Sequence, residues 1–128
     1  MDACTILLVE RDDLLRAGIA AVLTRNGFEV VPAPNALAAL ALVQPGGLEP
    51  DLVLLDLFLL QINGLMLLKS LRQIPALESV PAIVLSTQGF PDVIDQAISA
   101  GANDFILKPF DPQLLVEKIN RALHRVSS

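Results

Sequence analysis

The sequence predicts one α/β domain built on a doubly wound parallel sheet with helices on both faces. Five short apolar segments alternate with five segments of helical periodicity, a pattern typical of strand–helix–strand crossovers. The apolar run Leu52–Leu55 is uninterrupted, as in a strand buried on both faces. The 128 residues suffice for one such domain and leave no room for a second. We therefore assign residues 1–128 to a single domain with right-handed crossovers.

The first half of the chain contains three predicted strands and two predicted helices. The predicted strands are Thr5–Val9, Phe28–Val31 and Leu52–Leu55. Asp12 and Asp13 suit the first turn of a helix, because acidic side chains there both cap the helix and complement its dipole. Asn26-Gly27 ends that helix. Asn35 caps a second helix, rich in alanine and leucine, which runs to about Val43.

The second half contains the remaining two strands and three helices. The predicted strands are Pro81–Ser86 and Asp104–Leu107, and the predicted helices are Leu65–Gln73, Pro91–Ala100 and Pro112 to about Arg125. Two of these helices begin with proline, and Gly101 follows the end of one of them. This placement follows the usual preference for proline at a helix start and glycine after a helix end.

Composition excludes several classes of protein. Hydrophobic residues make up 53% of the chain and charged residues 18%, which excludes a disordered chain. The net charge of −5 argues against a basic surface that binds nucleic acid directly. The single cysteine, Cys4, rules out an internal disulfide, and we expect it in the core of the first strand. Neither a signal-peptide pattern nor a membrane-length apolar run is present, so we expect a cytoplasmic protein with no membrane partner.

Polar side chains follow four of the five predicted strands. They are Glu10, Arg11 and Asp12 after the first strand, Asp56 after the third, Ser86 and Thr87 after the fourth, and Lys108 after the fifth. The carboxyl ends of parallel strands meet at one edge of the sheet, where open α/β sheets bind their ligands. A carboxylate can attack a phosphoryl group, lysine and hydroxyl groups can hold its oxygens, and further acids can hold magnesium. The pattern therefore predicts a site that handles phosphoryl groups.

The segments that carry these residues resemble the receiver domains of two-component response regulators, the group that includes the single-domain chemotaxis regulator. The similar segments are ILLVERDDLLR, DLVLLDLFLLQINGL, PAIVLST and AGANDFILKPF, and they span almost the whole chain. The resemblance implies a (βα)5 flavodoxin-like fold whose five-stranded parallel sheet has the order 2-1-3-4-5. It also implies a phosphoaspartate switch in signal transduction. Such a switch is no enzyme beyond self-phosphorylation and self-dephosphorylation at Asp56.

The resemblance assigns a role to each matching residue. Asp56 matches the phosphoacceptor, Lys108 the lysine of the site, and Ser86 the hydroxyl that turns toward the phosphoryl group. Phe105 matches the aromatic switch position. By the same resemblance, the Lys108-Pro109 peptide is cis. The magnesium ligands that it implies are Glu10, Asp56 and the backbone carbonyl of Phe58.

Arg11 departs from the family pattern, because receiver domains carry a second magnesium-binding acid at this position. Glu10, Arg11, Asp56 and Lys108 have formal charges that sum to zero, whereas the usual site sums to −2. A dication about 5 Å from an arginine is repelled by several kcal/mol even at an effective dielectric constant of about 20. Asp12 is adjacent and acidic but is better placed to cap the first helix, so we assign it only a weak metal role. Magnesium binding is therefore doubtful.

Two milder departures concern the loop after the phosphoacceptor. Leu60 stands where receiver domains usually carry proline, which predicts a more mobile loop. Asn63 stands in place of the common aspartate before Gly64, a replacement that a turn tolerates well.

Arg11 leaves two functional hypotheses open. In the first, Asp56 accepts a phosphoryl group and magnesium binds weakly. In the second, Arg11 pairs with Asp56 and replaces magnesium, which would make the domain a pseudo-receiver that binds proteins independently of phosphorylation. A third class, a flavodoxin-like binder of small molecules, is disfavoured. ERDDLLR lacks the glycine-rich or hydroxyl-rich phosphate loop that such a site needs.

The resemblance also implies the partners. The phosphodonor would be a histidine kinase or a histidine phosphotransfer domain that docks near the first helix and Asp56. An output partner or a second copy of the chain would bind through about residues 91–125. The sequence leaves open whether the domain stands alone or belongs to a longer protein, and which kinase and output it serves.

Overall fold

The computed structural model describes residues 3–59 and 62–124, and five parallel strands form its central sheet. The strands pair in the order β2-β1-β3-β4-β5, which confirms the predicted order. Their bounds are β1 (Thr5–Val9), β2 (Glu29–Ala33), β3 (Leu52–Asp56), β4 (Ala82–Ser86) and β5 (Asp104–Leu107). The central position of β3 places its last residue, Asp56, between the carboxyl ends of neighbouring strands.

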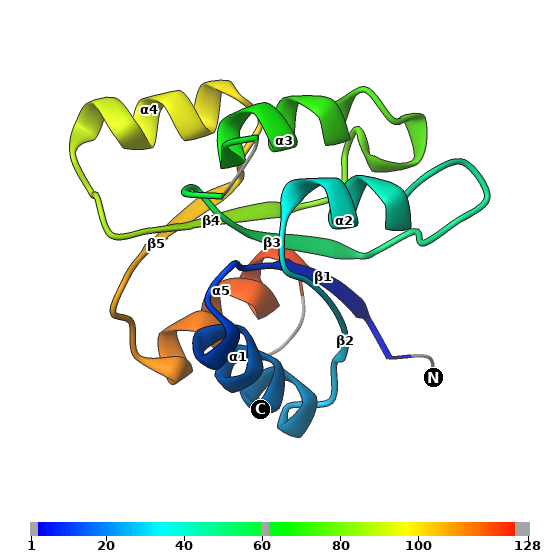
Figure 1. The fold of residues 1–128 in the computed structure, drawn as a ribbon. Coiled ribbons are helices and arrows are strands. Elements are labelled where there is room, and N and C mark those ends of the chain that lie inside the picture. The colour runs from blue at the N-terminus through cyan, green and yellow to red at the C-terminus, as the bar shows by residue number, and fades with distance from the viewer. Residues whose placement is uncertain (1–2, 60–61, 125–128) are drawn as a thin grey trace.

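Five α-helices cover the sheet on both faces, so the fold is doubly wound (Figure 1). Helices α2, α3 and α4 lie on one face, and α1 and α5 lie on the other. Their bounds are α1 (Asp13–Arg25), α2 (Ala36–Leu42), α3 (Gly64–Arg72), α4 (Pro91–Ser99) and α5 (Pro112–Ala122). A short 3-10 helix, η1 (Pro75–Leu77), follows α3 and was not predicted. Within the described residues, no helix combines the length and apolar character needed to cross a membrane.

Alternate residues of the inner strands point into two separate apolar layers. One layer, beneath α2, α3 and α4, contains Leu7, Val9, Val53, Leu55 and Val84. The other layer, against α1 and α5, contains Ile6, Leu8, Leu52, Leu54, Ile83 and Leu85. Every residue of β3 and β4 is buried, as the uninterrupted apolar runs predicted. The two layers hold the sheet rigid and so fix the positions of the residues at its carboxyl edge.

Several local predictions need correction. Strand β3 includes Asp56, β4 begins at Ala82 rather than Pro81, and α3 and α4 each end one residue earlier than predicted. Strand β2 begins at Glu29 rather than Phe28 and continues through Pro32 to Ala33. Proline is tolerated there because β2 is an edge strand that pairs only with β1. Cys4 precedes β1 instead of lying within it and is half-buried against the α1–α5 layer. Helix α5 ends at Ala122, and Arg125, the predicted end, lies outside the described residues, as does Leu60.

The helices that follow β1 and β3 each begin with a side-chain cap. Asp12 Oδ1 accepts a hydrogen bond of 3.0 Å from the Leu15 amide at the start of α1. Asn63 Oδ1 accepts one of 2.9 Å from the Met66 amide at the start of α3. Each cap satisfies an amide that would otherwise lack a partner at the helix start. Asn63 therefore serves in place of aspartate, as predicted.

Candidate functional site

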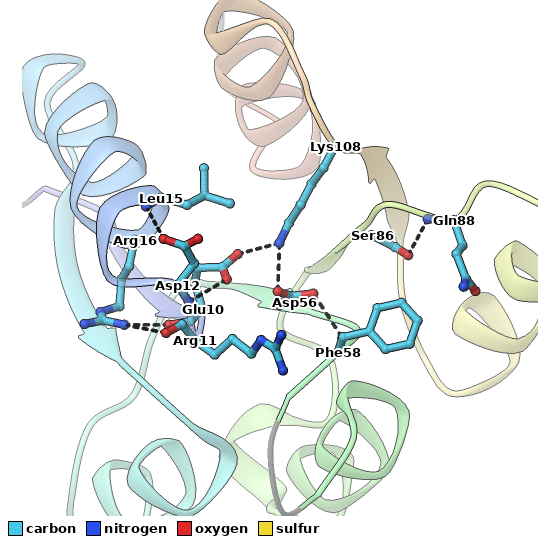
Figure 2. A network of polar contacts seen from close by, with 10 residues as sticks. All are labelled: Glu10, Arg11, Asp12, Leu15, Arg16, Asp56, Phe58, Ser86, Gln88 and Lys108. Atoms are coloured by element: carbon cyan, nitrogen blue, oxygen red, sulfur yellow. Dashed lines mark hydrogen bonds and ion pairs between the residues drawn. The ribbon is translucent and has the colours of Figure 1, made fainter.

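The carboxyl edge of the sheet brings together three charged side chains from distant parts of the chain. Val9 pairs with Leu55 in the parallel register of β1 and β3, so the residues that follow, Glu10 and Asp56, lie next to each other. Glu10 is fully buried, and Asp56 is only 4% exposed. Lys108 reaches them from the segment after β5 (Figure 2). Two buried carboxylates that share one lysine leave an excess of negative charge in the interior, which is rare in proteins and indicates a functional site.

Lys108 forms ion pairs with both carboxylates. Its Nζ lies 2.7 Å from Glu10 Oε1 and 2.7 Å from Asp56 Oδ2. The second oxygen of each carboxylate accepts a hydrogen bond of 3.0 Å from a backbone amide, that of Asp12 for Glu10 and that of Phe58 for Asp56. Every oxygen of the pair therefore has a donor, and the orientation of the Asp56 carboxylate is fixed. The Lys108-Pro109 peptide is cis, as predicted.

Burial and charge shift the pKa of two of these groups. Desolvation by burial is the main reason that the pKa of Glu10 is raised above its ordinary value of 4.5, and the neighbouring Asp56 raises it further. The hydrogen bonds from Lys108 and from the Asp12 amide act in the opposite direction but are outweighed. For Lys108, burial alone lowers the pKa. The hydrogen bonds and charges of Asp56 and Glu10 together outweigh burial and raise the pKa above 10.5.

The raised pKa of Glu10 predicts a pH-dependent loss of stability. The native state binds this proton more tightly than the unfolded chain does, so the contribution is fully present below pH 4.5. It is lost as the pH rises through the folded pKa. The unfolding free energy of Glu10→Gln should therefore increase relative to that of the native protein as the pH rises above 4.5. Urea denaturation of both proteins from pH 4 upward measures this difference. A difference independent of pH would contradict the assigned pKa shift.

Because of Lys108, the stability of the domain also depends on pH at the alkaline end of the range. Its folded pKa is raised, so the stability from its two ion pairs is present below pH 10.5 and is lost as the pH rises through the folded value.

Ser86 and Phe105, the predicted switch residues, lie on the neighbouring strands β4 and β5. Ser86 is fully buried, and its Oγ accepts a hydrogen bond of 3.0 Å from the Gln88 amide rather than contacting Asp56. Figure 2 shows Ser86 on the opposite side of Asp56 from Glu10. Phe105 is half-buried and packs against the layer beneath α2, α3 and α4. Their roles in switching remain predictions.

Arg11 and Asp12 follow β1 and are both exposed. Asp12 caps α1. In the part of the chain that the structure describes, the guanidinium of Arg11 has neither a hydrogen bond nor an ion pair; only its backbone carbonyl is bonded. Asp56 pairs with Lys108 instead of Arg11. Across residues 3–59 and 62–124, no three His, Cys, Asp or Glu side chains are grouped so that they could hold a metal ion.

Arg16 also belongs to the site, although the sequence reasoning did not identify it. Its Nη1 donates hydrogen bonds to the carbonyls of Glu10, at 2.8 Å, and Arg11, at 3.5 Å, and its Nη2 pairs with Asp13 at 2.6 Å. These contacts hold the backbone of the turn between β1 and α1. No sequence signal distinguishes this arginine from a solvated one, because its partners are backbone carbonyls.

Comparison with known proteins gives a consistent result. The family model of the response regulator receiver domain matches residues 6–120. The chemotaxis protein CheY of Bacillus subtilis is 37% identical over 120 residues, which cover 93% of this chain and 97% of that protein. The phosphate regulon transcriptional regulatory protein PhoB of Pseudomonas aeruginosa is 35% identical over 121 residues, which cover 94% of this chain and 52% of that protein.

Solved structures show the same fold. A response regulator receiver domain protein from Methanospirillum hungatei has a TM-score of 0.87 at 26% identity, and the match covers 96% of this chain and 95% of that chain. The present chain spans about half the length of the transcriptional regulators it matches and nearly the whole length of the chemotaxis protein.

Proposed function

Because this chain belongs to the response regulator receiver domain family, we propose that it accepts a phosphoryl group on Asp56 and transmits its presence to a partner. The observation that carries the proposal is the buried carboxylate of Asp56 at the end of β3, held by Lys108 and by the Phe58 amide. Receiver domains are signalling phosphoacceptors and not classical enzymes. The pseudo-receiver hypothesis has no support from the relatives, which are chemotaxis and transcriptional regulators.

The proposed reaction is a phosphoryl transfer to the carboxylate. An oxygen of Asp56 attacks phosphorus, a new oxygen–phosphorus bond forms, and the bond from phosphorus to the donor breaks with its electron pair on the donor. From a phosphohistidine, the leaving imidazole keeps that pair and takes up a proton from water. Lys108, already on Asp56 Oδ2 at 2.7 Å, stays beside the new acyl phosphate and partly neutralises its oxygens. Ser86 is the proposed hydroxyl that turns toward them, and Phe105 the proposed switch.

Receiver domains generally use Mg²⁺, but the residues present here fit this ion poorly. Glu10, Asp56 and the Phe58 carbonyl are the proposed ligands. Both carboxylates already share the positive charge of Lys108, and Arg11 supplies a second positive charge where the third carboxylate would stand. Asp12 Oδ1 already accepts the capping hydrogen bond from the Leu15 amide. We propose that the domain binds Mg²⁺ weakly and that its phosphoryl chemistry does not depend on a tightly held ion.

Receiver domains interact with histidine kinases or phosphotransfer proteins and with output domains. We propose that the phosphodonor docks on the apolar groove between α1 and α5, which runs up to Lys108 and is lined by Leu15, Ile19, Val22, Pro109, Phe110 and Leu115.

The proposed output or homodimer surface lies on α4, β5 and α5. Large apolar side chains stay exposed there: Phe90 at 68%, Leu107 at 49% and Leu114 at 41%. The proposed location is the cytoplasm, where histidine kinases obtain the phosphoryl group from ATP.

Phosphorylation of the purified domain tests the proposal. Incubation with acetyl phosphate, or with a phosphorylated histidine phosphotransfer domain, is expected to add one phosphoryl group, and peptide mapping is expected to place it on Asp56. Intact mass spectrometry measures the addition. The Asp56→Asn variant, which keeps the size of the side chain, serves as the control and is expected to stay unmodified. A native domain that stays unmodified by both donors, with and without Mg²⁺, would contradict the proposed function.

A further inference from the structure

We infer that Arg11 binds the phosphoryl oxygens on Asp56 and so performs, as part of the protein, the charge neutralisation that a divalent cation performs in other receiver domains. The inference rests on the proposed function, because it concerns the same phosphorylated carboxylate. It goes beyond that function by making Arg11 a direct ligand of the phosphoryl group, which gives the reason why phosphorylation needs no metal ion.

The first argument is that the backbone of Arg11 is held while its side chain is free. Arg16 donates to the carbonyls of Glu10 and Arg11, and the amide of Asp12 donates to Glu10 at 3.0 Å. Glu10 itself continues from β1, whose register with β3 places it beside Asp56. The position from which the Arg11 side chain starts is therefore fixed relative to Asp56. Its guanidinium, exposed and without a hydrogen bond or ion pair in the described structure, is available to a ligand.

The second argument is that, among the described residues, the neighbouring carboxylates already have other partners. Glu10 and Asp56 are both paired with Lys108, and Asp13 is paired with Arg16 at 2.6 Å. Asp12 gives one oxygen to the α1 cap. In Figure 2, Lys108 approaches Asp56 from above, and the guanidinium of Arg11 lies below it, so the two cations stand on different sides of the carboxylate in this view.

The third argument is the charge of the phosphorylated site. An aspartyl phosphate carries about two negative charges at neutral pH. With Glu10, Lys108 and Arg11, the formal charge of the site is −1. A site with a second carboxylate in place of Arg11 and a bound dication also sums to −1. Arg11 therefore gives the phosphorylated state the same formal charge as the metal-bound site, without an ion.

Guanidinium chemistry suits this role. The planar fork of arginine donates two parallel hydrogen bonds to phosphate oxygens, stays charged at all accessible pH values, and loses less hydration energy than an ammonium group. The transferred group spreads its negative charge over its outer oxygens, so a fork beside Asp56 stabilises both the transition state and the product. The bonds formed and broken at phosphorus are those described above, and no further reactant is needed.

Four proteins test the inference: the native domain, Arg11→Gln, Arg11→Asp and, as a matched control, Arg25→Gln. Arg25 is an exposed arginine at the far end of α1. Each is incubated with acetyl phosphate in EDTA and in Mg²⁺, and the rate of modification at Asp56 is followed by intact mass. The native domain and Arg25→Gln are expected to react in EDTA within about threefold of their rates in Mg²⁺. The rate of modification of Arg11→Gln in EDTA is expected to fall about ten- to a hundredfold, which corresponds to the free energy of a charge-assisted hydrogen bond. Arg11→Asp is expected to react only in Mg²⁺.

A second readout does not depend on phosphorylation. Amide NMR shifts during Mg²⁺ titration are expected to give at least about tenfold tighter binding to Arg11→Asp than to the native domain, because the substitution removes a repelling charge and adds a ligand. Native modification that requires Mg²⁺, an unchanged rate in Arg11→Gln, or reaction of Arg11→Asp alone would each overturn the inference and leave the receiver function standing. Failure of every folded variant to react under all conditions would overturn the proposed function, and the inference with it.

Discussion

Lys108→Met is expected to lower the free energy of unfolding at neutral pH by about 3 kcal/mol and to slow phosphorylation of Asp56 by about a hundredfold. The lysine is the cation paired with two buried carboxylates, each at 2.7 Å, and its own side chain is only 14% exposed. Methionine has a similar length but no charge. It would leave Glu10 and Asp56 buried together without compensation, and it would remove the donor beside the reacting oxygen.

The pH dependence of the stability loss in Lys108→Met separates the effect of the two uncompensated carboxylates from a simple packing defect. Without Lys108, the pKa of Glu10 rises further, so Glu10 takes up a proton at a higher pH. The stability gap between Lys108→Met and the native domain should therefore narrow as the pH falls from 7 toward 5. Urea denaturation at both pH values measures the gap.

Lys118→Met is the matched control. Lys118 pairs with Asp104 at 2.8 Å, but that aspartate is more exposed, at 28%, so we expect a loss of less than about 1 kcal/mol. Equal losses in the two lysine variants, or a gap at Lys108 that does not change with pH, would show that the double ion pair does not determine the stability of the site.

Gly64→Ala is expected to destabilise the domain by about 3 kcal/mol and to reduce phosphorylation of Asp56, because the added methyl group would displace the end of β3. A Cβ at Gly64 would lie 2.7 Å from Leu57 Cα and 3.0 Å from the Leu57 carbonyl oxygen, and it would also clash with the carbonyl of Asp56. These atoms are all backbone, so no change of rotamer relieves the overlap. The Gly64 amide also donates to the Leu57 carbonyl at 2.8 Å, which ties α3 to the phosphoacceptor segment.

Gly18→Ala provides the comparison. Gly18 lies in the middle of α1, and a Cβ there would have no atom within 4 Å. Alanine should therefore stabilise the helix by about 0.5–1 kcal/mol. Thermal unfolding followed by circular dichroism, together with the phosphorylation rate, measures both variants. If Gly64→Ala folds and reacts like the native domain, close packing of α3 against β3 does not position Asp56.

Local sequence patterns predicted the fold well where hydrophobic burial decides structure. The apolar run before Asp56 and the alternation of strands with helices led to the five parallel strands, and aspartate and asparagine correctly marked the starts of α1 and α2. The errors occurred where packing against neighbouring elements, rather than the local sequence, decides the structure. The continuation of β2 through Pro32 is possible only because β2 is at the edge of the sheet, and the 3-10 helix after α3 has no periodicity to reveal it.

Local sequence patterns identify the residues that reach the carboxyl edge of the sheet, because each strand's end is a local property of the chain. Glu10, Asp56, Ser86 and Lys108 were all assigned to that edge from the strands they follow. How these groups pair depends on the tertiary structure. Lys108 bridges Glu10 and Asp56, Arg16 holds the turn after β1, and the guanidinium of Arg11 has no partner among the described residues. Ion pairs depend on distances of a few ångströms between segments far apart in the chain, and those distances are set by how the strands and helices pack.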